Sequence, residues 1–306
     1  MPKYFVVPDN YGSEHLQTKS CKPLVDMHYE QLMEDIIMKP MTYNEFTFLD
    51  EEYANVGVNK GFTRPIFNDF KHKFTNHLLN SKLNKLTGFE KFNKVEITLG
   101  CAQYIDNLHI KHDVQIMKNE YSYHQKLNPL LVPKTLDTIE SGKELIISLP
   151  FCQHGSIHED MDSILDKCYK LNIPVHIDGA WITASRDINF DFSHPAIKSV
   201  AISMSKGYGL SAWNRIGLRW SNVTDEDSIT VLNDYIQINT YSVVIGNYFL
   251  DHTEPDHLWN KHGDKHLKIC NDFDLEPSNT IHIGKQNGNS VGLSPLIRYL
   301  EYVQTN

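Results

Sequence analysis

Six short apolar runs, separated by helical or polar stretches, constrain the fold of this chain more than any other feature. Each run is rich in Val, Ile and Leu, which is typical of buried β-strands. The runs are Val95–Leu99, Val114–Met117, Leu145–Leu149, Pro174–Asp178, Ser199–Met204 and Ile216–Trp220. Strands that alternate with helices predict a three-layer α/β/α domain with a mostly parallel mixed sheet. Such sheets place their active sites at the carboxyl ends of the strands.

The spacing of apolar residues also predicts helices and a division of the chain. We expect helices over 26–38 and 66–79, and a third that presents its apolar face between residues 157 and 171. The pattern predicts three parts. Residues 1–60 form an N-terminal arm and part of a small lobe, 61–222 form the large domain, and 223–306 form a short α+β C-terminal lobe.

Composition excludes several classes of protein. The 29 basic and 38 acidic side chains give a net charge of −9, which disfavours a nucleic-acid partner. No apolar run approaches the ~20 residues needed to span a bilayer, so we expect no membrane partner. Five scattered cysteines without a C-x-x-C pair, and a start without a long apolar stretch, predict a cytoplasmic protein.

Two of the predicted strand ends carry residues suited to a bound group. Gly100, Cys101 and Ala102 follow the first run and open a helix, where small residues expose backbone N–H groups to a phosphate. Tyr121 and Tyr123 follow the second run, and either can stack on an aromatic ring.

Two further strand ends carry charged groups. Asp178 ends the fourth run, and a buried carboxylate requires a cationic or N–H partner, such as a protonated pyridine nitrogen. The fifth run leads to Lys206 within Ser203-Met204-Ser205-Lys206, and Arg215 lies nine residues further on. A lysine in this setting can form a Schiff base with an aldehyde while its neighbours bind an anion. The combination predicts pyridoxal 5'-phosphate as the cofactor.

The ordered motifs over about residues 95–220 resemble the fold-type I pyridoxal-phosphate enzymes, and most of all the class I/II aminotransferase superfamily. "ITLGCAQ" is similar to that family's phosphate turn, "VHIDGAW" to its Asp-x-Ala-Tyr segment, and "SMSKGYGLSAWNRIG" to its Ser-x-Ser-Lys…Arg-x-Gly signature. The resemblance implies that Lys206 forms the Schiff base and moves the proton at Cα. It implies that Asp178 holds the ring nitrogen and that Tyr121 stacks on the ring, with Tyr123 as the alternative.

The resemblance also implies the remaining ligands of the cofactor. The phosphate would be bound by the Gly100 turn with the amides of Cys101 and Ala102, the hydroxyls of Ser203 and Ser205, and Arg215. Tyr53, in "YANVG", is similar to the tyrosine that reaches the phosphate of the partner subunit.

The chain departs from the family pattern on the ring-hydroxyl side and in its C-terminal part. Cys152 or Gln153 stands where the family has an asparagine, and Trp181 stands where it has a tyrosine. Arg298 is the only arginine after Arg219, so position alone makes it the candidate for binding a substrate carboxylate.

The function expected from this resemblance is a pyridoxal-phosphate-dependent aminotransferase acting on a small amino acid or a related amine. A lyase, decarboxylase or racemase with the same cofactor is the alternative, because the bond that breaks at Cα depends on residues that the sequence does not reveal. A degenerate, non-catalytic member is the third reading. We expect a homodimer with active sites at its interface, and no metal ligands.

Overall fold

A six-stranded sheet lies at the centre of the protein. The computed structural model describes residues 7–18, 21–38, 65–210, 214–222 and 226–305. The sheet has the order β2-β8-β7-β5-β4-β3. Its strands are β2 (Lys94–Thr98), β3 (Val114–Ile116), β4 (Glu144–Ser148), β5 (Val175–Gly179), β7 (Ile197–Ser203) and β8 (Gly217–Ser221). The pairs β3–β4, β4–β5 and β5–β7 are parallel, and β8 runs antiparallel to both of its neighbours. The predicted mostly parallel mixed sheet is therefore confirmed.

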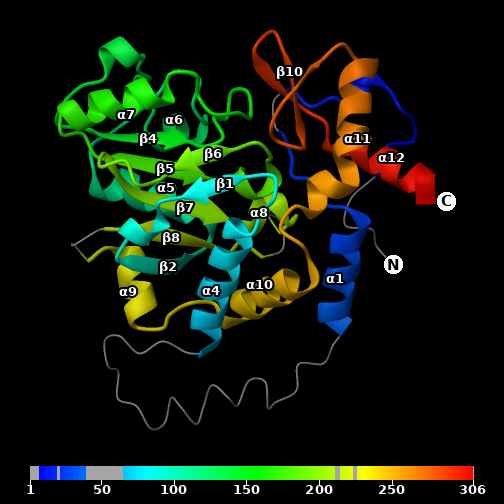
Figure 1. Cartoon of the computed structure of the whole chain (residues 1–306), viewed down its shortest axis with the longest axis horizontal. Helices are drawn as coiled ribbons and strands as arrows, with labels where there is room; N and C mark the ends of the chain where they lie inside the picture. Colours follow the sequence, from blue (N-terminus) through cyan, green and yellow to red (C-terminus); the bar gives the residue numbers. More distant parts are fainter. Residues whose placement is uncertain (1–6, 19–20, 39–64, 211–213, 223–225, 306) are drawn as a thin grey trace.

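Helices cover both faces of this sheet (Figure 1). Strand residues alternate between the faces, so Ile146 and Ala201 pack with α5, whereas Ile147 and Ile177 pack with α7. The helices are α1 (Met27–Met38), α4 (Pro65–Leu79), α5 (Gly100–Lys111), α6 (Tyr123–Leu127), α7 (Met161–Lys170), α8 (Met204–Gly207), α9 (Ser228–Asp234), α10 (Thr240–His252), α11 (His257–Asp272) and α12 (Ser294–Thr305). The three predicted helices correspond to α1, α4 and α7.

A second layer of structure lies beside the carboxyl ends of the strands. It contains the antiparallel sheet β11-β10-β9, with α11 and α12 packed together next to it (Figure 1). The strands are β9 (Glu276–Pro277), β10 (Ile283–Gln286) and β11 (Asn289–Gly292), and a separate parallel pair joins β1 (Lys85–Thr87) to β6 (Asn189–Asp191). Gln17 bridges to Gly292, so the N-terminal segment joins this part. The boundary expected after residue 222 falls between β8 and α9 and stays a prediction.

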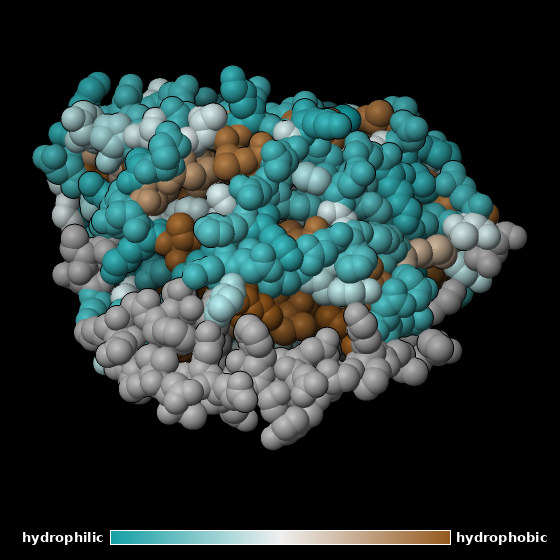
Figure 2. All heavy atoms as spheres, turned by 60° about the horizontal axis from the view of Figure 1, so that its bottom comes forward, coloured by the Kyte–Doolittle hydropathy of each residue, from teal (hydrophilic) through white to brown (hydrophobic). Residues whose placement is uncertain are grey.

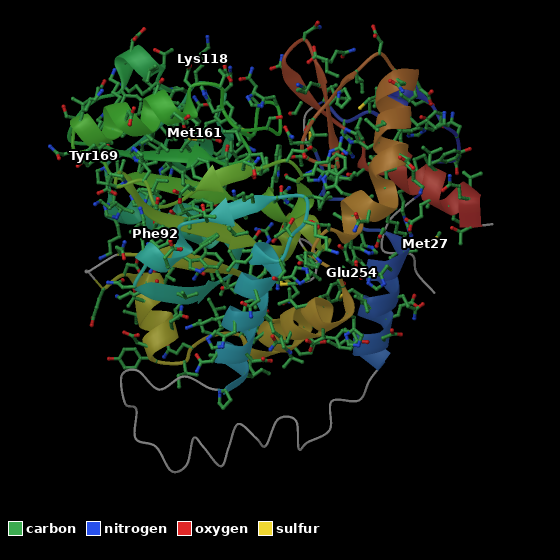
Figure 3. All side chains as sticks on the ribbon, viewed as in Figure 1. Met27, Phe92, Lys118, Met161, Tyr169 and Glu254 are labelled. Carbon is green, nitrogen blue, oxygen red and sulfur yellow. The ribbon has the colours of Figure 1, made fainter. Side chains whose placement is uncertain are left out.

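Buried charges hold α1 against α11 and α12. The Asp26 carboxylate is fully buried and lies 2.7 Å from His257 Nε2 and 3.2 Å from Lys261 Nζ. The amide of Met27, which is labelled in Figure 3 at the start of α1, donates to Glu301 at 3.1 Å. Burial alone raises the pKa of Asp26, but the histidine hydrogen bonds lower it well below its usual value. These contacts therefore fix an ionised carboxylate inside the junction.

The surface agrees with the composition. Among the described residues, none of the helices has the length and apolar content to cross a bilayer. Figure 2 shows a largely hydrophilic face on which apolar atoms gather near the centre. Most large apolar side chains lie in the core instead.

The packing of α4 yields a prediction about stability. Phe70 is fully buried and stacks on Phe74 with ring centroids 5.8 Å apart. The Phe70→Ala substitution should lower the free energy of unfolding by about 3–5 kcal/mol, because it leaves a cavity. Urea denaturation measures the loss. The control Ile110→Ala, whose side chain is 81% exposed, should cost about 0.5 kcal/mol or less, and equal losses for the two variants would contradict this packing.

Candidate active site

The register of the central sheet brings distant segments to one edge. Thr98 of β2 pairs with Gly217 of β8, which pairs with Ser203 of β7. Two residues beyond this row lie Gly100, Arg215 and Ser205. A Cβ built on Gly100 would lie 3.4 Å from the Ser205 hydroxyl and 4.0 Å from Arg215 Cβ, and the φ of Gly100 is +73°. A glycine is therefore needed where the start of α5 meets these side chains.

A pocket of about 440 Å³ opens at this edge. Strand ends of the large sheet form most of its wall, and the N-terminal segment and β11 close the other side. The residues that line it are Thr18, Cys21, Cys101, Ala102, Ile105, Tyr121, Ser122, Lys126, Ser148, Pro150, Cys152, Asp178, Ala180, Trp181, Ser203, Ser205, Lys206, Arg215 and Ser290.

One end of the pocket is suited to an anion. The N-cap residue of α5 is Leu99, whose side chain makes no hydrogen bond to the first turn of the helix. Cys101 and Ala102 of that turn line the pocket, and their backbone amides have no side-chain cap from Leu99. The positive end of the helix dipole lies there, beside the hydroxyls of Ser203 and Ser205 and the guanidinium of Arg215. These groups together can bind a phosphate.

Asp178 provides the opposite charge on the floor of the pocket. Its carboxylate is 5% exposed and accepts a hydrogen bond from the Ala180 amide at 3.1 Å. Burial raises the pKa of Asp178, and hydrogen bonding from Cys101 and the charge of Lys206 offset part of this rise. A carboxylate in this environment favours a cationic or N–H partner in the pocket.

Lys206 lies between these two ends, in the short helix α8 directly after β7. Burial lowers the pKa of Lys206, while Cys21 and Asp178 partly restore it. A larger share of the amine is then neutral near pH 7 than for an exposed lysine, which favours its use as a nucleophile or base. The adjacent Gly207 allows α8 to lie against η4 (Ile182–Ala184), because a Cβ there would come within 2.4 Å of Thr183.

The side walls differ in chemistry. Tyr121 lines the pocket and is 48% exposed, and its hydroxyl interacts electrostatically with both Asp178 and Arg215. Trp181 lies at the wall and packs edge-on against His282, with centroids 5.5 Å apart. Cys152 lies on the side of β4, and its thiol donates to the Asn119 carbonyl at 3.3 Å.

Most of the residues expected from the sequence line this pocket, and Gly100 adjoins its lining residues Ser205 and Arg215, but Tyr123 and Arg298 lie elsewhere. Tyr123 donates to the Asp106 carboxylate at 2.7 Å, away from the lining. Tyr53 lies outside the described residues. Arg298 is 1% exposed and pairs with Glu30 and with Glu301, so its guanidinium is directed at two carboxylates rather than at the pocket.

Other residues of the pocket were not foreseen from the sequence. Thr18, Cys21 and Ser290 come from the N-terminal segment and β11, and Lys126 comes from α6. None of them belongs to a recognisable motif. Thr18, Cys21 and Ser290 reach the site through the packing of the second part of the structure against the sheet, whereas Lys126 lies in the connection from β3 to β4. Glu120 lies behind the wall and precedes Tyr121 directly, a position that alone could have drawn attention to it.

Comparisons with known proteins agree with this geometry at the level of the fold. No family model matches the chain, and no curated protein matches its sequence. Among solved structures, an alanine aminotransferase from Pyrococcus furiosus matches 94% of this chain and 92% of its own, with a TM-score of 0.59 and 10% identity. A PLP-bound putative aminotransferase from Clostridium difficile 630 matches 90% of this chain and 78% of its own, with a TM-score of 0.59 and 13% identity. A PLP-bound C-S lyase from Staphylococcus hominis matches 87% of this chain and 74% of its own, with a TM-score of 0.59 and 10% identity.

The chain therefore has the fold of the fold-type I, aminotransferase-like enzymes. The resemblance predicted from the motifs is confirmed at this level.

The position of Arg298 leads to a prediction about stability. The Arg298→Met substitution should lower the free energy of unfolding by about 3 kcal/mol or more, because it removes the buried guanidinium from the Glu30 and Glu301 carboxylates and leaves Glu301 with Lys261 as its remaining cation among the described residues. The control Lys268→Met removes an exposed ion pair to Asp272 on α11 and should cost about 0.5 kcal/mol. Urea denaturation compares the two, and a loss below about 1 kcal/mol for Arg298→Met would contradict the assignment.

Proposed function

We propose that the pocket binds pyridoxal 5'-phosphate through Lys206 and that the protein is a pyridoxal-phosphate-dependent enzyme. The observation that carries the proposal is the order of groups along one pocket. An anion site of helix amides, hydroxyls and Arg215 lies at one end, the Asp178 carboxylate lies on the floor, and the Lys206 amine lies between them. Pyridoxal phosphate has an anionic group, a basic ring nitrogen and an aldehyde, so its three functions match these three features.

The residues of the chain fit this group on physical grounds. The Asp178 carboxylate is buried, and a protonated ring nitrogen would supply the charge that its burial requires. Gly100 leaves room beside Ser205 and Arg215 that a side chain would fill, so a phosphate can approach the amides of α5. Tyr121, at the outer wall, offers an aromatic face for the ring.

When bound, pyridoxal phosphate supplies an aldehyde carbon and a ring that accepts electrons from the bonds at Cα. The protein supplies the rest. Asp178 keeps the ring nitrogen protonated, and Arg215 with the α5 amides holds the phosphate in place. The Lys206 amine, whose pKa burial lowers, can accept the Cα proton of the substrate and return it at a neighbouring carbon.

Within this class we propose transamination of a small amino acid or related amine as the leading activity. Two of the fold neighbours described above are aminotransferases by name, whereas another is a C-S lyase. The alternative is thus a lyase, decarboxylase or racemase. Which bond at Cα would break depends on how the pocket holds the substrate, and Thr18, Cys21 and Ser290, which line the pocket, would contribute to holding it.

We further propose that the protein is a cytoplasmic homodimer. The five cysteines are free, which fits a reducing compartment. The dimer follows from the same resemblance that places Tyr53 near a partner's phosphate, and light scattering tests it.

One prediction of the proposed function concerns Lys206. Incubation with pyridoxal phosphate should produce a visible absorption band of a Schiff base that borohydride reduction removes, and Lys206→Ala should lack it. The matched control is Lys126→Ala, which removes the other lysine of the described lining and should keep the band. A wild-type protein without the band, or a band that survives in Lys206→Ala, would overturn the proposal.

The same preparation separates the activities. Single amino acids or amines are added, and conversion of the cofactor to pyridoxamine phosphate supports transamination. Release of carbon dioxide or of a side-chain fragment supports the decarboxylase or lyase alternative, and inversion at Cα alone supports a racemase.

The next prediction concerns Arg215. Arg215→Met should weaken the affinity for pyridoxal phosphate by about 10- to 100-fold, because charged hydrogen bonds to the phosphate are lost. The affinity for pyridoxal, which has no phosphate, should stay unchanged. Equilibrium titration of the visible band measures both, and an equal loss for the two aldehydes would place Arg215 elsewhere.

A further inference from the structure

A second buried carboxylate lies behind the pocket wall. Glu120 is 8% exposed and follows β3, one residue before Tyr121. Its Oε1 accepts hydrogen bonds from the Tyr121 amide at 2.7 Å and from the Ser148 hydroxyl at 2.6 Å. Its Oε2 accepts from the Ser148 amide at 2.8 Å. The Glu120 side chain thus binds backbone amides at the ends of two neighbouring strands, after β3 and in β4.

The chain of contacts continues to Cys152, another residue of the lining. The Ser148 hydroxyl, which donates to Glu120, accepts a hydrogen bond from the Cys152 amide at 3.0 Å. Ser148 is also the Cα partner of Asp178 in the pairing of β4 with β5. Glu120 is therefore connected to Tyr121 on one wall, to Cys152 on another, and through the sheet to the strand position of Asp178.

We propose that Glu120 is a positioning residue, whose carboxylate holds Tyr121 and, through Ser148, Cys152 in the arrangement that receives the cofactor ring. The part of this inference that concerns the cofactor ring rests on the proposed function. The hydrogen bonds of Glu120 are present in the protein without a cofactor. Three hydrogen-bond donors converge on the Glu120 side chain, so both of its terminal atoms must be acceptors. An ionised carboxylate meets this requirement, whereas the amide nitrogen of a glutamine is a donor.

The charge of Glu120 also acts on the Cys152 thiol. Burial raises the pKa of Cys152, and the nearby charge of Glu120 raises it further. Asp178 adds to the rise, and the Ser148 hydroxyl opposes it. Tyr121 also interacts electrostatically with the thiol. Cys152 is then a neutral thiol near pH 7, and only the thiolate reacts with alkylating agents.

These relations give a test on the cofactor-free protein. In a Cys21→Ser background, which removes the other half-buried cysteine of the pocket, Cys152 is alkylated with iodoacetamide at several pH values. In the parent protein the rate should still be rising above pH ~9.5, because an ordinary thiol has a pKa near 8.5. Glu120→Gln should shift the profile to lower pH and raise the rate at pH 9 by about ten-fold or more.

Matched variants separate positioning from a structural contribution alone. Glu90→Gln, at an exposed position, should leave the alkylation profile unchanged. Glu120→Asp keeps the charge but shortens the reach by one methylene. It should retain the high-pH profile and still weaken pyridoxal phosphate binding by about ten-fold, because Tyr121 and Ser148 lose a shared anchor.

The outcomes distinguish this inference from the proposed function. If the parent protein binds no pyridoxal phosphate, the proposed function fails. The alkylation profiles still decide whether Glu120 acts on the Cys152 thiol. An unchanged profile in Glu120→Gln overturns the inference. If Glu120→Gln does not fold by circular dichroism, the parent profile and Glu120→Asp decide, and an ordinary thiol midpoint in the parent overturns the inference.

Discussion

The pairing of β7 with β5 on one side and β8 on the other is the constraint on which the site depends. Asp178 pairs with Ala201, and Ser203 pairs with Gly217, so the carboxyl end of β7 lies between a carboxylate and the start of β8. A shift of one residue would turn each of these side chains to the opposite face of the sheet. Because helices pack against both faces, such a shift would disrupt the close packing of the strand side chains and turn the Asp178 carboxylate away from the pocket, so it is strongly disfavoured.

The same register gives the pocket its electrical polarity. The uncapped start of α5 and Arg215 create a positive end, whereas Asp178 and Glu120 create a negative floor and wall. Burial raises the pKa values of both Glu120 and Asp178, so the two carboxylates stay ionised most readily when a cation is nearby. Lys206 lies where these fields meet, and its burial disfavours the charged amine. The site thus favours the neutral form of the Lys206 amine more than an exposed position would, and it does so beside groups of opposite charge.

The sequence predicted the parts of the fold that follow from local patterns. Apolar runs predicted every strand of the large sheet, and helical spacing placed Phe67, Phe70, Phe74 and Leu78 in the core. Motifs at strand ends predicted Asp178, Lys206 and the Gly100 turn as neighbours, because parallel strands bring their carboxyl ends to one edge. Residues that reach the pocket from other lobes, such as Cys21 and Ser290, have no local signal. Arg298 was assigned to a substrate by position alone, and its burial between Glu30 and Glu301 depends on how α1 and α12 pack.

A crystal structure of the protein grown with pyridoxal phosphate tests the central claim most directly. The account predicts continuous electron density from Lys206 Nζ to the cofactor, with the ring nitrogen within hydrogen-bond distance of Asp178 and the phosphate at the start of α5. Density for the cofactor at any other lysine, or a ring whose nitrogen faces away from Asp178, would contradict the account.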